Sequence, residues 1–170
     1  MLPLAEELNA LDEAGFVAAL EPLFERAPRF LQQLARERPF ESHEVLLGRA
    51  EVLALRLPEA EQVELIDSHP RIGAAPASVS AQSFREQGYD RDAGTAELQA
   101  SLDRLNDEYE RRFGFRFVIF VAGRPRSEIA RIIEQHLAAD RDEEKQRALR
   151  DVVAIARDRL SRQGAAGESA

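Results

Sequence analysis

The stretch "TAELQASLDRLNDEYERRFGFRFVIFV", residues 95–121, decides between an all-α fold and a mixed one. Its first part predicts a long helix over 96–113, because Thr95 is a favourable N-cap and Gly114 stands where a left-handed C-terminal cap is expected. Its last part, 115–121, alternates apolar residues as a β-strand does, but no second segment suits it as a partner strand. Since an isolated strand leaves its backbone hydrogen bonds unmade, we interpret 115–121 as an extended connector through the core or as a distorted helix start.

The rest of the chain has the apolar period of helices. Phe16, Leu20, Leu23 and Phe24 fall on one helical face. Further helices are expected over 28–37, over 43–57 behind Ser42, over 58–69, near 83–87, over 128–139 behind Ser127, and over 140–162 up to Gly164. We therefore predict an all-α fold, a single compact bundle of about seven to eight helices over 1–163, with 164–170 as a disordered tail.

The composition excludes several classes of protein. The 170 residues carry a net charge of −8, and Lys and Arg are scattered, whereas nucleic-acid binding needs a clustered positive face. The absence of cysteine excludes disulfides, thiolate catalysis and Cys-ligated zinc. No apolar run approaches the roughly 18 residues of a membrane span. The acidic start "MLPLAEELNALDEAG" lacks the basic region of a secretory signal, so we expect a cytoplasmic protein with no membrane partner.

His69 stands at the break between a helix and a loop of small residues. Pro70 disfavours the α conformation at His69, which should therefore leave the helix at its C-terminal end. The helix dipole is negative there and favours an imidazolium, which suits a proton donor near neutral pH. The alternative is that His69 only caps its helix.

After that loop, Ser83, Glu86 and Gln87 can share one helical face. A hydroxyl, a carboxylate and an amide together could recognise a small polar ring bearing N–H and C=O groups. The alternative is a solvated surface helix.

Arg159 continues an apolar stripe of the last helix with Val152 and Ile155. A guanidinium directed inward needs an anion, because an unpaired buried charge is costly. That anion is either an internal carboxylate or a carboxylate of a substrate. His43 and His136 are expected to be solvated, and the three histidines lack metal-ligand spacing, so no metal site is predicted.

Four blocks, "HPRIG" (69–73), "SFREQ" (83–87), "LNDEYERRFGFRFVIFVAGR" (105–124) and "AIARDRL" (154–160), stand in the order and near the spacing of a known family. Over residues 11–161 the chain resembles 2-oxo-4-hydroxy-4-carboxy-5-ureidoimidazoline (OHCU) decarboxylase of urate degradation. The resemblance implies an all-α, cofactor-free enzyme that forms homodimers and converts OHCU to S-allantoin and carbon dioxide.

The resemblance also implies roles for individual residues. His69 matches the proton donor, Glu86 the catalytic carboxylate and Arg159 the arginine of the terminal Arg-Leu pair. The expected substrate-binding residues are Pro70, Ser83, Phe84, Arg85, Glu86 and Gln87, together with Phe117, Val118, Ile119, Phe120 and Val121.

The chain departs from many family members at Arg71, where they carry Asp, in the loop 74–82, and at "EQGYD" (86–90). Two other functions are therefore kept open at this point. One is a lyase of the same family acting on a related ureido acid, and the other is a non-enzymatic helical interaction module.

Overall fold

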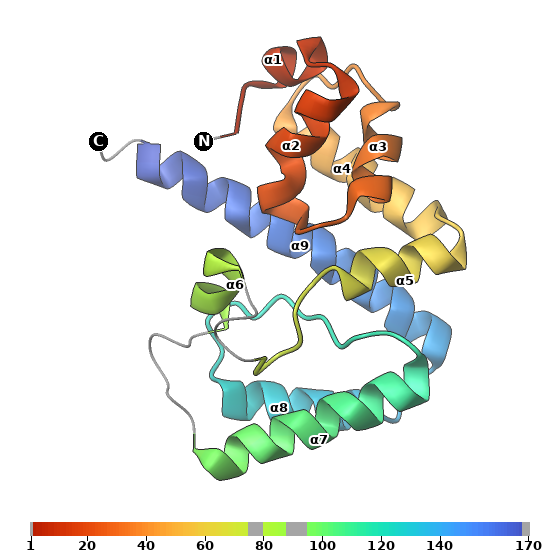
Figure 1. The fold of residues 1–170 in the computed structure, drawn as a ribbon, viewed down its shortest axis with the longest axis vertical. Helices are drawn as coiled ribbons and strands as arrows, with labels where there is room; N and C mark the ends of the chain where they lie inside the picture. The colour runs from red at the N-terminus through yellow and green to blue at the C-terminus, as the bar shows by residue number, and fades with distance from the viewer. Residues whose placement is uncertain (1, 75–79, 88–94, 168–170) are drawn as a thin grey trace. The chain divides into compact units, whose positions relative to one another are not determined.

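A computed structural model describes residues 2–74, 80–87 and 95–167 (Figure 1). Within these ranges the chain has nine helices and no β-strand, which confirms the predicted all-α fold. The helix that the sequence did not predict is α1 (Ala5–Ala10), a short one whose Leu8 is buried. Its first turn is closed by Glu7, whose carboxylate accepts the Leu4 N–H at 2.7 Å.

The chain forms two compact units, one of Met1–Ser68 with Leu149–Ala170 and the other of His69–Ala148. The first unit contains α2 (Glu13–Phe24), α3 (Pro28–Ala35), α4 (His43–Arg56) and α5 (Glu59–Asp67). In it α2 packs on α1 and α3, and α3 also contacts α4 and α5. The predicted stripe of Phe16, Leu20, Leu23 and Phe24 is buried, as expected.

The second unit contains α6 (Ala81–Glu86), α7 (Ala96–Phe113) and α8 (Arg126–His136), and α9 (Arg141–Gly167) begins in it. Helices α7 and α8 lie side by side (Figure 1). The core of this unit is aromatic. The Tyr109 ring lies 4.5 Å from Phe113 and 5.1 Å from Phe117 between centroids, and Phe115 is also buried.

Helix ends follow the predicted caps in three places. Ser42 and Thr95 accept the N–H groups of Val45 and Leu98 at 3.2 and 3.1 Å. Gly114 ends α7 with φ of 78°, a left-handed conformation that glycine adopts without strain from a Cβ atom.

Two other predicted helix ends are wrong. Helix α8 begins at Arg126 and not behind Ser127, because the Pro125 carbonyl accepts the first helical N–H groups, from Glu128 and Ile129. Helix α9 continues past Gly164 to Gly167. A glycine inside a helix costs only about 1 kcal/mol relative to alanine, and two alanines follow it.

Residues 115–121 form an extended connector, which confirms the first of the two interpretations and rules out a helix start. Phe115, Phe117, Val118, Ile119 and Val121 are buried. Both faces of the connector are therefore covered, and its alternation does not mark a sheet.

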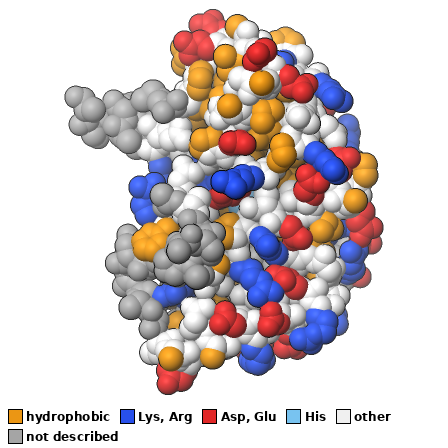
Figure 2. Space-filling view, viewed as in Figure 1, with side chains coloured by type: hydrophobic (Ala, Val, Ile, Leu, Met, Phe, Trp, Pro, Cys, Tyr) orange, Lys and Arg blue, Asp and Glu red, His pale blue; other side chains and the backbone are white. Residues whose placement is uncertain are grey.

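The surface carries charges of both signs. Figure 2 shows Lys and Arg interspersed with Asp and Glu over the face that it draws. Among the described residues, none of the helices combines the length and the apolar composition that a membrane span requires.

Candidate active site

His69 lies immediately after α5, as the His-Pro pair predicted. Helix α5 ends at Asp67, Ser68 is its C-cap, and His69 follows with only 3% of its surface exposed. The Ser68 hydroxyl donates to the Leu65 carbonyl at 2.7 Å and so satisfies one of the free carbonyls at the helix end. The Ser68 hydroxyl therefore caps α5, and His69 is buried at the start of the loop that follows.

The backbone of residues 69–73, here called the His69 loop, is held by side chains from other elements. The His69 carbonyl accepts from Arg116 at 3.0 Å, and the Ile72 carbonyl accepts from Asn106 of α7 at 2.9 Å. The Gly73 carbonyl accepts from Gln99 of α7 at 2.8 Å. The loop is thus tied to both the long helix α7 and the connector.

Helix α6 brings Gln87 to the same loop. The Gln87 amide oxygen accepts the Gly73 N–H at 2.8 Å, and its nitrogen donates to the Arg71 carbonyl at 3.1 Å. Gln87 and Ser83 are 5% and 3% exposed, so a fully solvated helix is the wrong interpretation. Glu86 is half-buried on this helix.

The remaining predicted residues of this helix and of the His69 loop are more accessible. Phe84 and Pro70 are half-buried, and Arg85 is exposed.

The connector supplies backbone groups. Its carbonyls at Val118 and Phe120 accept from Arg147 and Arg124, at 2.8 and 2.9 Å. Within the described part of the chain, the N–H groups of residues 117–121 donate no hydrogen bond. Buried backbone N–H groups are almost always paired, so a run of such donors is suited to a bound polar ligand.

A family model described as OHCU decarboxylase matches residues 9–161 of the chain. The chain belongs to the OHCU decarboxylase family. It is 31% identical over 161 residues to the OHCU decarboxylase of Halalkalicoccus jeotgali, a match covering 91% of this chain and 88% of that protein.

It is also 31% identical over 160 residues to the uric acid degradation bifunctional protein PucL of Bacillus subtilis. That match covers 92% of this chain and 32% of PucL, so the chain spans about a third of the length of this relative.

A solved structure described as OHCU decarboxylase in the presence of (S)-allantoin has the same fold. The match has a TM-score of 0.69 at 18% identity and covers 90% of this chain and 98% of that one. Three of the four blocks that resemble the OHCU decarboxylase family lie in the unit His69–Ala148, and the hydrogen bonds above join residues of all three.

The fourth block lies on α9 in the other unit, where Arg159 has internal partners. Its side chain is 1% exposed and forms an ion pair with Glu25, with Nη2 2.8 Å from Oε1. Its Nη1 donates to the carbonyls of Pro22 and Leu23 at 3.3 and 3.2 Å. Of the two anions that the sequence left open, the internal carboxylate is therefore present.

A buried ionic cluster behind the connector was missed by the sequence analysis. Glu144, 2% exposed, accepts from Tyr109 at 2.7 Å and from Arg147 at 2.6 Å, and His136 Nδ1 lies 2.8 Å from its other oxygen. The expectation of a solvated His136 is wrong, because its ring is paired with this carboxylate. The arginine of this cluster also binds the Val118 carbonyl, so the cluster supports the connector.

Electrostatics in this cluster favour a charged Glu144. Burial by itself raises the pKa of Glu144, but hydrogen bonds from Arg147 and Tyr109 lower it, and the net pKa lies below its usual range. Burial and the hydrogen bond to Glu144 raise the pKa of the Tyr109 hydroxyl, which therefore stays protonated as a donor.

The two α7 residues that hold the His69 loop, Gln99 and Asn106, were missed by the sequence analysis although they had a detectable signal. They lie seven residues apart on a helix, so they share one face, and Asn106 is 1% exposed between apolar neighbours. An amide on the apolar face of a helix needs a polar partner, which here is the loop backbone.

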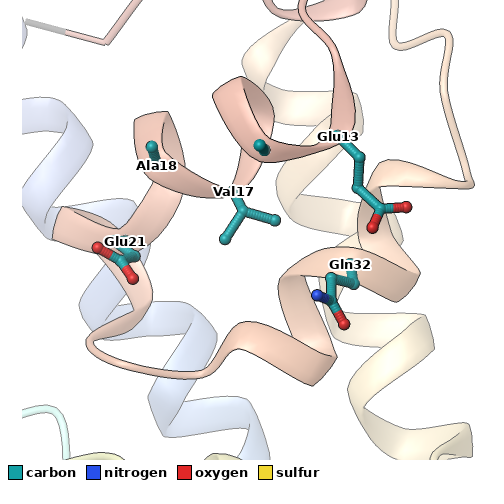
Figure 3. A pocket seen from close by; sticks show the side chains of 6 residues that line it. Glu13, Val17, Ala18, Glu21 and Gln32 are labelled. Carbon is teal, nitrogen blue, oxygen red and sulfur yellow. The ribbon is translucent and has the colours of Figure 1, made fainter.

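One open hollow lies in the other unit, on the outer side of α2 and α3 (Figure 3). It has a volume of about 340 Å³, and none of the predicted site residues lines it. The lining residues are Glu13, Ala14, Val17, Ala18, Glu21 and Gln32. Among the described residues, no group of three or more His, Asp or Glu could hold a metal ion.

Two of the three places where the sequence departs from many family members fall largely outside the described residues. The loop 74–82 is described only at its ends, and "EQGYD" only at Glu86 and Gln87. Arg71 is described and is treated below.

Proposed function

We propose that the chain catalyses the cofactor-free decarboxylation of OHCU to S-allantoin and carbon dioxide in urate degradation. The observation that carries the proposal is the buried His69 at the head of a loop held by Gln87 and Arg116, residues from three separate family blocks. Membership of the OHCU decarboxylase family supports the same reaction.

The reaction suits a site made of side chains and backbone alone. The substrate carries a carboxylate on a carbon beside a ring carbonyl. When the carbon–carbon bond to the carboxylate breaks and carbon dioxide leaves, the electron pair moves onto that carbonyl oxygen. One proton must then reach the carbon from one side. The protein's contribution is orientation, electrostatic stabilisation and delivery of that proton.

In this proposal His69 donates the proton and thereby sets the configuration of the product. Glu86 either holds His69 or acts on the substrate carboxylate. The N–H donors of residues 117–121 bind the ring. Ser83 and Pro70 line the site, together with Phe84 and Arg85.

We assign Arg159 the stabilisation of an anionic or carbonyl group of the substrate. The family resemblance supports this role, and the contacts to Glu25, Pro22 and Leu23 hold the guanidinium in a fixed position.

The test is His69→Asn, assayed with freshly generated OHCU while circular dichroism follows the configuration of the allantoin formed. The variant should lose directed decarboxylation and leave only the spontaneous reaction, which gives racemic allantoin. His43→Asn is the matched control, because His43 lies on α4 in the other unit and contacts the Pro3 carbonyl. Optically pure S-allantoin from the His69 variant at the parent rate would falsify the assignment.

Glu86→Gln tests the carboxylate separately. It should lose most of the activity while keeping the fold, since Glu86 is only half-buried. A near-normal rate would remove Glu86 from the chemistry and leave it a structural role.

The same assay separates the proposed reaction from its rivals. A related lyase acting on another ureido acid would accept OHCU poorly, and an interaction module would not change its decay.

We further propose a cytoplasmic homodimer, as the family resemblance and the lack of cysteine suggest. Light scattering coupled to size-exclusion chromatography would test the dimer.

A further inference from the structure

The His69 loop carries an ion pair in addition to its backbone hydrogen bonds. Arg71 Nε and Nη2 donate to the two carboxylate oxygens of Glu110, each at 2.6 Å, and Nη2 also lies 2.9 Å from Asp107. This geometry is bidentate, the arrangement in which an arginine fixes direction as well as distance. The hydrogen bonds to Glu110 raise the pKa of Arg71 above its usual range, so the guanidinium stays charged.

The anchor for this pair is a regular helix. Glu110 and Asp107 lie on α7, which also provides Asn106 and Gln99 to the loop backbone. The turn at Gly73 packs closely on the same helix. Its φ is 78°, and a Cβ atom there would meet the Leu102 side chain at 3.1 Å. The loop therefore follows α7 closely, and a shift of the Arg71 end moves the backbone that carries His69.

Loops are the mobile part of most folds, whereas proton delivery to one face of a substrate requires a fixed donor. A misplacement of about 1 Å can cost about 100-fold in rate. The side chain of Arg71 points to helix α7 and lies two residues from His69, so it can set the position of the imidazole without reaching the substrate.

We propose that Arg71 is a positioning residue, which acts through its bidentate pair with Glu110 of α7 to fix the His69 loop for proton transfer. This proposal rests on the function proposed above.

The test is a double-mutant cycle with Arg71→Gln, Glu110→Gln and both together. Each single variant should lose about 10- to 100-fold in kcat, with KM changed by less than about threefold. The double variant should lose no more than the worse single variant, because each residue acts through the other. Losses that multiply, or an unchanged kcat in either single variant, would overturn the proposal.

Two further variants keep the result interpretable. Glu108→Gln is the matched control on the same helix, since Glu108 pairs with Arg104 and not with the loop, and it should leave kcat unchanged. If Arg71→Gln does not fold, Arg71→Lys serves instead. It keeps the charge but cannot form the bidentate contact, and it should also lower kcat.

A readout independent of activity is the imidazole of His69 in ¹H–¹⁵N spectra. The chain has only three histidines, so comparison with His69→Asn assigns the signal. Arg71→Gln should shift the His69 signal and leave those of His43 and His136 in place. If it does so in a chain that proves inactive toward OHCU, the proposed function fails and the positioning role stands. If the chain is active and the signal does not move, the positioning role fails.

Discussion

Replacing Glu144 with Gln should destabilise the unit His69–Ala148 by about 3 kcal/mol. The carboxylate is 2% exposed and is the centre of the cluster behind the connector. One oxygen accepts from Tyr109 and twice from Arg147, at 2.7, 3.0 and 2.6 Å, and the other lies 2.8 Å from His136. Gln has nearly the same shape, so the substitution changes charge and hydrogen bonding without opening a cavity.

The size of the expected loss of stability depends on the interactions that Arg147, His136 and Tyr109 keep in the variant. Removing one member of a fully buried ion pair costs about 3 to 5 kcal/mol. Arg147 and His136 keep 22% and 29% of their side-chain surface exposed, so water can partly replace the lost anion. Tyr109 can still donate to the amide oxygen. We therefore expect the lower end of the range, which corresponds to a fall of about 6 to 12 °C in Tm.

The difference in the free energy of unfolding between the parent chain and Glu144→Gln should depend on pH. The pKa of Glu144 is lowered on folding, so its contribution to stability is present above the unfolded-state pKa and is lost as pH falls through the folded pKa. Urea unfolding followed by circular dichroism should therefore show a constant difference in unfolding free energy from about pH 8 to about pH 5. Below about pH 4 this difference should shrink.

Glu143→Gln is the control, because Glu143 is the exposed neighbour on the same helix. A loss below about 1 kcal/mol in Glu144→Gln, or a difference that persists undiminished in acid, would refute the reasoning.

Three further substitutions test the elements around the site by thermal melting. Gly114→Ala should cost about 1 kcal/mol or slightly more, because its φ of 78° is unfavourable for a residue with a Cβ atom. Thr95→Ala should cost about 1 kcal/mol through the lost cap on the Leu98 N–H, whereas Thr95→Ser should be close to neutral. Tyr109→Phe should cost about 1 to 2 kcal/mol by removing a donor from buried Glu144, and an unchanged Tm would show that this bond contributes nothing.

The helices of this chain could be predicted because their signals are local. Thr95 and Gly114 act through their own backbone neighbourhood, and the apolar stripe from Phe16 to Phe24 needs only the helical period. The predicted end of the last helix at Gly164 was wrong, because a glycine is only a weak helix breaker when the residues around it favour the helix. For residues 115–121 the sequence argued against a strand, since a strand without a partner cannot satisfy its backbone, but it left an extended connector and a distorted helix start as alternatives.

The partners of the charged groups could not be predicted, because pairing depends on segments that are distant in sequence. The apolar stripe around Arg159 predicted that the guanidinium has an anionic partner. It could not identify that partner as Glu25, which is 134 residues away and is one of 31 acidic residues in the chain. Glu144 and His136 are eight residues apart on either side of a helix break, so no helical spacing relates them.

Helix α7 joins the two halves of the candidate site because its faces carry different side chains. Gln99, Asn106 and Glu110 follow one another at intervals of seven and four residues and face the His69 loop. Tyr109 and Phe113, four residues apart, face the aromatic core and the cluster that holds Val118. From Gln99 to Glu110 the helix rises about 16 Å, and along this length it anchors Arg71, Ile72 and Gly73 of the loop. The cofactor-free reaction proposed above depends on the placement of the protein's own groups. Helix α7 holds both the His69 loop and, through Tyr109 and Glu144, the cluster that supports the connector, so it relates their positions through rigid geometry.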